Sequence, residues 1–117
     1  FPRELRLVTP SHFSRIFDKP VKAVSDHFTL LAKYNDLEHP RLGLIVAKKK
    51  EKTAPGRNRI KRITRESFRL NQHNLPNIDI VVLARDGIGN VDNEKLNKQL
   101  NKLWKKIAHR CESSLKK

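Results

Sequence analysis

The chain has 117 residues, enough for one hydrophobic core but not for two, so we predict a single domain over residues 1–117. Lys and Arg number 26 against 12 Asp and Glu, and a formal net charge of +14 favours a polyanionic partner, nucleic acid first and an anionic membrane surface second. At 37% apolar residues the chain is too hydrophobic for a disordered basic tail. No apolar stretch approaches the roughly 20 residues of a membrane-spanning helix, so we expect no membrane span.

The first predicted element is a short helix within residues 7–20. Thr9 and Pro10 favour its start, because threonine caps helices and proline fits the first helical turn. Phe13 and Phe17 lie four residues apart and therefore share one face of the helix. From the residues alone this face is more simply core than binding surface, because a short helix must dock to be stable.

Strands are predicted through the middle of the chain. Residues 21–34 contain two strand-like runs with a break at 25–27, and residues 41–49 (RLGLIVAKK) are rich in branched apolar side chains. Residues 78–85 (IDIVVLAR) read as a further buried strand. A helix separates the segments 41–49 and 78–85, so these two strands can be parallel neighbours.

Cations stand at the ends of these last two strands. Lys48 and Lys49 end the first of them, and Arg85 ends the second. If the strands are parallel, all three cations leave the sheet at one edge, and Lys50 and Lys52 extend the patch into the next loop. The alternative is that they are ordinary polar strand ends.

The most unusual segment is the basic helix, predicted from Pro55 or Gly56 to Leu70. At about 100° per residue, its inward face carries Ile60, Ile63, Ser67 and Leu70, with Thr64 and Phe68 at the boundaries. Its outward face carries Asn58, Lys61, Arg62, Arg65 and Arg69, flanked by Arg57 on one side and Arg59 on the other. A solvated helix face usually mixes signs, but Glu66 is the only acid here, so neighbouring cations repel each other. A row of phosphates would relieve that repulsion.

The last helix opens near Asp92 or Asn93 and completes the fold. Its apolar stripe has helical spacing and consists of Leu96, Leu100, Leu103, Trp104 and Ile107. The predicted order is α-β-β-β-α-β-α, which indicates an α+β fold, a compact two-layer sandwich of helices on a four-stranded sheet.

Chemistry-bearing residues are scattered rather than clustered. The histidines lack the spacing of metal ligands, and Asp86, Asp92 and Glu94 near a turn suit capping better than chelation. With only four glycines, the chain contains no glycine-rich phosphate loop. The single Cys111 excludes an internal disulfide and is typical of a reducing cytoplasm, and we see no secretion signal. We therefore predict no catalytic residue and no metal site on the protein.

Three segments together resemble the protein subunit of bacterial ribonuclease P. They are HFSRIF near the start, RLGLIVAKK, and GRNRIKRITRESFR, in which residues 57–62 and Arg65 match the arginine-rich helix motif of that family. The resemblance covers nearly the whole chain in the same order of elements. It implies a left-handed crossover through the basic helix, against the usual right-handed rule.

The resemblance also implies a function and its partners. In that family a catalytic RNA subunit removes the 5′ leader of precursor tRNA with magnesium that the RNA mainly holds, while the protein binds this RNA and the leader. No obligate protein partner and no membrane are implied. The implied RNA-subunit contacts are Arg57, Asn58, Arg59, Lys61, Arg62, Arg65 and Arg69. The implied leader cleft, between the first helix and the sheet, uses Phe13, Phe17, Leu31, Lys48, Lys49 and Arg85.

Two other classes of protein share some of these features. A structural ribosomal RNA-binding protein has a similar size and charge, but it needs no apolar cleft for a mobile single strand. An autonomous phosphodiesterase would need clustered acids or histidines, and the sequence provides none. The second, apolar RNA surface is therefore the discriminating feature.

Overall fold

The computed structural model describes residues 16–17, 19–35 and 37–115. Of the predicted first helix only Ile16 and Phe17 are described, and both are helical; Phe13 lies outside the described residues. The remaining elements are β1 (Val21–Val24), β2 (Phe28–Tyr34), β3 (Arg41–Ile45), α2 (Ala54–Asn71), β4 (Ile78–Ala84) and α3 (Asn93–Leu115). Two short 3₁₀ turns, η2 (Gln72–Asn74) and η3 (Ile88–Asn90), follow α2 and β4. The predicted α+β class is confirmed, and so is the order of elements from the first strand to the last helix.

The four strands form one sheet in the order β1-β2-β4-β3. β1 pairs with β2 and β2 with β4 in antiparallel fashion. β3 and β4 are parallel, with Arg41 opposite Asp79 and Ile45 opposite Leu83, so α2 is the crossover between them. The parallel pairing is therefore as predicted, whereas the left hand of the crossover stays a prediction.

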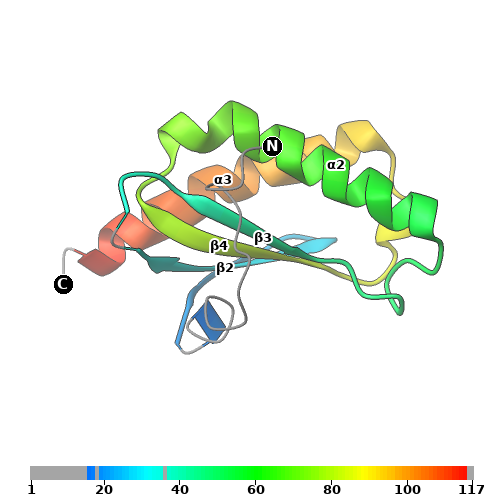
Figure 1. The fold of residues 1–117 in the computed structure, drawn as a ribbon, viewed down its shortest axis with the longest axis horizontal. Helices are drawn as coiled ribbons and strands as arrows, with labels where there is room; N and C mark the ends of the chain where they lie inside the picture. Colours follow the sequence, from blue (N-terminus) through cyan, green and yellow to red (C-terminus); the bar gives the residue numbers. More distant parts are fainter. Residues whose placement is uncertain (1–15, 18, 36, 116–117) are drawn as a thin grey trace.

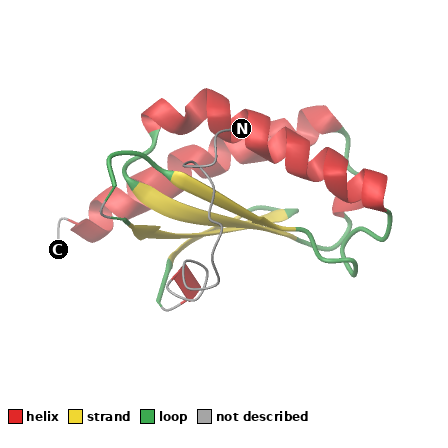
Figure 2. Ribbon diagram, in the orientation of Figure 1, coloured by secondary structure: helices red, strands yellow, loops and turns green. Residues whose placement is uncertain are grey.

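Both long helices cover one face of this sheet (Figures 1 and 2). The predicted stripe of α3 is wholly buried there. Trp104 joins the two helices, because its Nε1 donates a hydrogen bond of 2.8 Å to Ser67 Oγ and its ring meets Phe68 edge-to-face at 5.9 Å. The core between helices and sheet thus fixes how α2 presents its opposite face to solvent.

The other face of the sheet carries a smaller apolar cluster. Ile16, Leu31 and Val81 are buried together, and Leu83 packs against them. The described helical turn at residues 16–17 lies on this side, away from α2 and α3 (Figure 1). The chain therefore uses both faces of its sheet.

One end of this second face is polar. Asp79, which is 1% exposed, accepts hydrogen bonds from Arg41 Nε at 2.8 Å and Nη2 at 2.7 Å, and another from Asn35 Nδ2 at 2.9 Å. Asn35 also donates to the carbonyl of His39, so the network ties the β2–β3 loop to the strands. A buried carboxylate held this way is structural.

The end of β3 and the buried face of α2 differ from the sequence-based expectation. β3 ends at Ile45 rather than at Lys49, because Ala47 O accepts hydrogen bonds from the amides of Lys50 and Glu51 and the chain turns. In α2, Phe68 is fully buried, while Leu70 is 68% exposed. The buried stripe of α2 continues from position 60 through 64 to 68 in steps of one turn, and position 70 falls outside it.

Candidate RNA-binding surfaces

The start of α2 is fixed by a local network. Thr53 caps the helix by accepting a hydrogen bond from the amide of Gly56 at 3.1 Å. The Glu51 carboxylate accepts hydrogen bonds from the amide and hydroxyl of Thr53, which lower the pKa of that carboxyl. A Cβ at Gly56 would lie 2.7 Å from Thr53 Oγ1, so a larger residue there would disturb the cap. These contacts fix the start of α2, and with it the start of its basic face, directly after Thr53.

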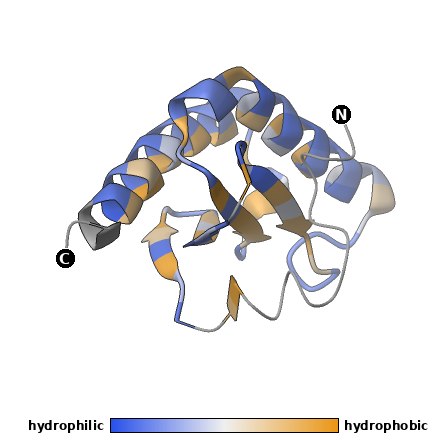
Figure 3. Ribbon diagram, turned by 60° about the vertical axis from the view of Figure 1, so that its left-hand side comes forward, coloured by the Kyte–Doolittle hydropathy of each residue, from blue (hydrophilic) through white to orange (hydrophobic). Residues whose placement is uncertain are grey.

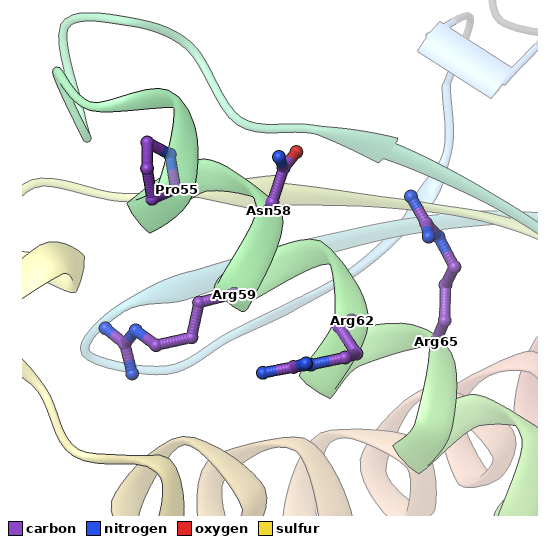
Figure 4. Close-up of a pocket in the computed structure, with 5 residues that line it drawn as sticks. All are labelled: Pro55, Asn58, Arg59, Arg62 and Arg65. Carbon is purple, nitrogen blue, oxygen red and sulfur yellow. The ribbon is translucent and has the colours of Figure 1, made fainter.

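The outward face of α2 is a surface of exposed arginines. A shallow hollow of about 350 Å³ is lined by Pro55, Asn58, Arg59, Arg62 and Arg65 (Figure 4). A smaller one of about 160 Å³ lies one turn further on, between Arg62, Arg65, Glu66 and Arg69. Hollows between guanidinium groups fit phosphate oxygens, which arginine binds through two parallel hydrogen bonds.

The predicted RNA-binding arginines fall into two groups that sequence reasoning did not separate. Arg59 Nη1 donates to Val91 O at 3.1 Å and to Asn93 Oδ1 at 2.7 Å, and Nη2 donates to Gly89 O at 3.4 Å. Arg57 Nη1 donates to the carbonyls of Glu51 and Lys52 at 3.0 and 2.9 Å. These two arginines fasten α2 to the loops around it.

The other arginines of the face have few or no partners within the protein. Arg62 and Arg65 are exposed, and neither side chain makes a hydrogen bond or ion pair with any residue that the structure describes. Arg69 pairs with Glu66 at 2.9 Å, and this contact lowers the pKa of the Glu66 carboxyl. Arg62 and Arg65 are consequently the most available phosphate ligands on α2.

The predicted cations at the strand ends do lie at one end of the parallel pair. Lys48 and Lys49 are exposed in the turn after β3, and Arg85 follows β4 directly. Arg85 Nη1 donates to Ser25 O at 2.9 Å, which holds this side chain against the β1–β2 turn. Lys50 pairs with Asp86 at 2.8 Å and lowers the pKa of that carboxyl. The two loops that leave this edge are therefore linked.

The second face of the sheet exposes apolar surface next to these cations. Phe17 is 48% exposed, whereas Leu31 is only 8% exposed. The sheet register places Val24, Thr29, Leu83 and Ile45 in one row across all four strands. Val24 and Ile45, at the two ends of this row, are both more than a third exposed. The row lies at the strand ends from which Lys48 and Arg85 emerge.

The described residues offer little for metal or covalent chemistry. They contain no group of three His, Cys, Asp or Glu side chains that could hold a metal ion. Cys111 is buried, and burial raises the pKa of its thiol to about 11, so it is protonated at neutral pH. Among the same residues no helix is both long and apolar enough to cross a membrane.

Comparisons with known proteins agree with one another. A family model described as Ribonuclease P matches residues 1–108. The ribonuclease P protein component of Pseudoalteromonas translucida is 62% identical over 111 residues, covering 95% of this chain and 79% of that protein. That of Yersinia pestis is 53% identical over 114 residues, covering 97% of this chain and 96% of that protein.

Solved structures give the same picture at lower sequence identity. A mutant Staphylococcus aureus RNase P protein, described as defective in mRNA degradation, superposes with a TM-score of 0.83 at 29% identity, covering 88% of this chain and 87% of that one. The RNase P protein of Thermotoga maritima gives a TM-score of 0.77 at 32% identity, covering 86% of this chain and 96% of that one.

Proposed function

The chain belongs to the ribonuclease P protein family, whose members are the protein part of the ribonucleoprotein that matures the 5′ end of tRNA, and we propose that two of its surfaces bind two different RNAs. The catalytic RNA subunit cleaves precursor tRNA, using magnesium that the RNA mainly holds. The protein, as one RNA-binding domain in the cytoplasm, grips this RNA with α2 and the single-stranded 5′ leader with the opposite face of its sheet. It supplies no catalytic residue.

The outward face of α2 binds the RNA subunit through phosphates. Arg62 and Arg65 carry most of this contact, since their guanidinium groups are exposed and face solvent rather than the protein. Asn58, Lys61 and Arg69 extend the same face. Arg57 and Arg59 act by orienting the helix, which is why their hydrogen bonds end on neighbouring loops.

The leader lies on the second face of the sheet. The exposed ring of Phe17 offers a stacking platform for an unstacked base, worth roughly 1–3 kcal/mol per base. Lys48, Lys49 and Arg85 hold the leader's phosphates at the strand ends. Leu31 is the floor beneath the site, because it is packed against Ile16 and Val81. The family resemblance implies the same role for Phe13, which lies outside the described residues.

One observation carries this proposal above the ribosomal alternative. The chain has two chemically different surfaces on opposite sides of one sheet: the cationic face of α2 on one side, and on the other the half-exposed ring of Phe17 and a strand-end row whose outer members, Val24 and Ile45, are exposed. A protein that only clamps folded RNA needs the first surface and not the second.

The experiment that tests the proposal compares two substrates. The protein assembled with ribonuclease P RNA should bind precursor tRNA more tightly than mature tRNA, and the difference should shrink as the leader is shortened. Equal affinity for both tRNAs at every leader length, with the protein bound to the RNA subunit, would reject the leader assignment.

A further inference from the structure

A second row of cations lies along the outer face of α3, and the proposed function leaves it unused. The exposed cations of this face are Lys95, Lys98, Lys102, Lys105, Lys106 and Arg110. At about 100° per residue, the five lysines fall within a band about 100° wide, opposite the stripe that packs on the sheet. In Figure 3 the ribbons of both helices are coloured as hydrophilic over much of their length. We call these five lysines the lysine face of α3.

The lysine face is almost without compensating charge. Lys98 lies 3.5 Å from Glu94, and both side chains are largely exposed; this is the one ion pair that α3 makes among the described residues. Lys102 has a lysine three or four positions away on both sides, and each such pair costs a few tenths of a kcal/mol. Solvent alone does not explain a face of one sign, because solvated helices commonly alternate charge.

The lysine face is separate from the arginine face of α2. Asn101 is on the flank of α3 that approaches α2, where its Oδ1 accepts a hydrogen bond of 3.4 Å from Asn71 Nδ2 of α2. This flank carries Asn97, Glu94 and Glu112 as well, and so it is neutral or acidic. The opposite flank meets β1, where Arg110 donates a hydrogen bond to the carbonyl of Lys22. Uncharged and acidic side chains therefore lie between α2 and most of the lysine face.

The surface at the start of the lysine face is built from several segments rather than from a helix alone. A hollow of about 400 Å³ is lined by Asp26, His27, Asn90, Val91, Lys95, Lys98 and Gln99. Gln99 Oε1 accepts hydrogen bonds from Ser25 Oγ at 2.8 Å and from the His27 amide at 3.0 Å. These contacts fix the β1–β2 turn against α3, so Lys95 and Lys98 line an open hollow together with residues of that turn.

We propose that the lysine face of α3 binds the sugar–phosphate backbone of a second RNA segment, distinct from the segment held by α2. The proposal rests on the proposed role of the chain as an RNA-binding subunit. The segment belongs to the RNA subunit, on which the proposed function already places the chain; binding of the tRNA body, which offers the same phosphate chemistry, is the alternative that the second arm of the test detects. Lysine suits such contacts, since a point charge on a flexible stem follows a backbone without reading its sequence.

The test uses the full chain assembled with ribonuclease P RNA. Lys102→Gln/Lys106→Gln removes two charges from the middle of the face without breaking the Lys98–Glu94 pair. The matched control, Asn74→Asp/Asn77→Asp, lowers the net charge equally in the exposed loop after α2. One arm measures affinity for the RNA subunit, and the other measures affinity of the assembled particle for mature tRNA, each over a range of salt.

In the RNA-subunit arm the lysine variant should bind about 25- to 60-fold more weakly near roughly 0.1 M salt, with the log–log salt slope flattened by about 1.4 to 1.8. The tRNA arm should be unchanged. The control should keep the affinity of the unchanged protein. A second variant, Lys95→Gln/Lys105→Gln, should repeat the result, and thermal unfolding should be unchanged in both.

Unchanged affinity and slope in the RNA-subunit arm, a loss in the tRNA arm alone, or equal losses in the control would overturn the proposal. Weaker binding to vesicles of anionic phospholipid, with both RNA arms unaffected, would overturn it as well and assign the face to a membrane surface. Failure of the proposed function is seen separately, because that role depends on Arg62 and Arg65 of α2 and not on these lysines.

Discussion

The division of labour among the α2 arginines gives the sharpest prediction. Arg62→Gln/Arg65→Gln removes two exposed guanidinium groups that bond to no described residue. Unfolding free energy should therefore change by less than about 0.5 kcal/mol. If each arginine neutralises one phosphate, the salt slope of binding to the RNA subunit should flatten by about 1.4 to 1.8.

Arg59→Gln is the matched contrast on the same helix. Its guanidinium bonds to Val91 O, Asn93 Oδ1 and Gly89 O, and these contacts fasten α2 to the start of α3. Their loss should lower the unfolding free energy by about 1–3 kcal/mol. The salt slope should stay close to that of the unchanged protein, because no phosphate contact is removed.

The assay is the same for both proteins. Urea unfolding gives the stability, and titration of the RNA subunit at several salt concentrations gives the slope. Equal flattening of the slope by Arg59→Gln and by the double variant, with normal unfolding of Arg59→Gln, would contradict this division between the arginines. The division is equally contradicted if the double variant leaves the slope unchanged.

Three further predictions address the leader, the buried ion pair and the thiol. Phe17→Ala should cost roughly 1–3 kcal/mol of affinity for precursor tRNA and leave the affinity for mature tRNA unchanged. Equal losses of affinity for both RNAs, with the unfolding free energy lower by about 3–5 kcal/mol, would place the ring in the core. Asp79→Ala should lower the unfolding free energy by about 3–5 kcal/mol, because it leaves Arg41 without its bidentate partner; urea unfolding within 1 kcal/mol or so of the unchanged protein would contradict this. The pKa of Cys111 is raised to about 11 in the folded chain, so the stability that its protonated thiol contributes is intact below the ordinary cysteine pKa and is lost as pH rises toward 11. Cys111→Ala should remove that alkaline loss in a series of unfolding curves, and an unchanged pH profile would show that another group titrates.

Local patterns in the sequence were enough to predict most of the fold. The stripe of α3 follows from helical spacing, and the predicted start of α2 at Pro55 or Gly56 lies within two residues of the observed Ala54. The parallel pairing of β3 and β4 follows from the helix between them. The expectation that Leu70 faces inward is wrong, since its side chain is exposed. Helical angles alone do not show where the packing of a helix against the core stops. The end of β3 was also missed, because residues 46–49 continue the strand pattern while their backbone turns.

The candidate site was predictable as a region but not in its details. The basic face of α2 is visible in the sequence because its cations recur with helical spacing. The hydrogen bonds of Arg59 could not be predicted from the sequence, because their acceptors lie 30 to 34 positions further along the chain. The sequence did contain one indication. Arg59 lies on a flank of the outward face rather than at its centre, and a flanking arginine is better placed to reach a neighbouring loop.

The most direct test of the account is cleavage of precursor tRNA by the reconstituted particle at low magnesium. The protein should restore 5′ maturation by ribonuclease P RNA under conditions in which the RNA alone is slow, and the protein alone should cleave nothing. Single substitutions of Asp, Glu or His that preserve folding should leave the single-turnover chemical step nearly intact. Cleavage by the protein without RNA, or no effect of the protein on the RNA at any magnesium concentration, would contradict the account.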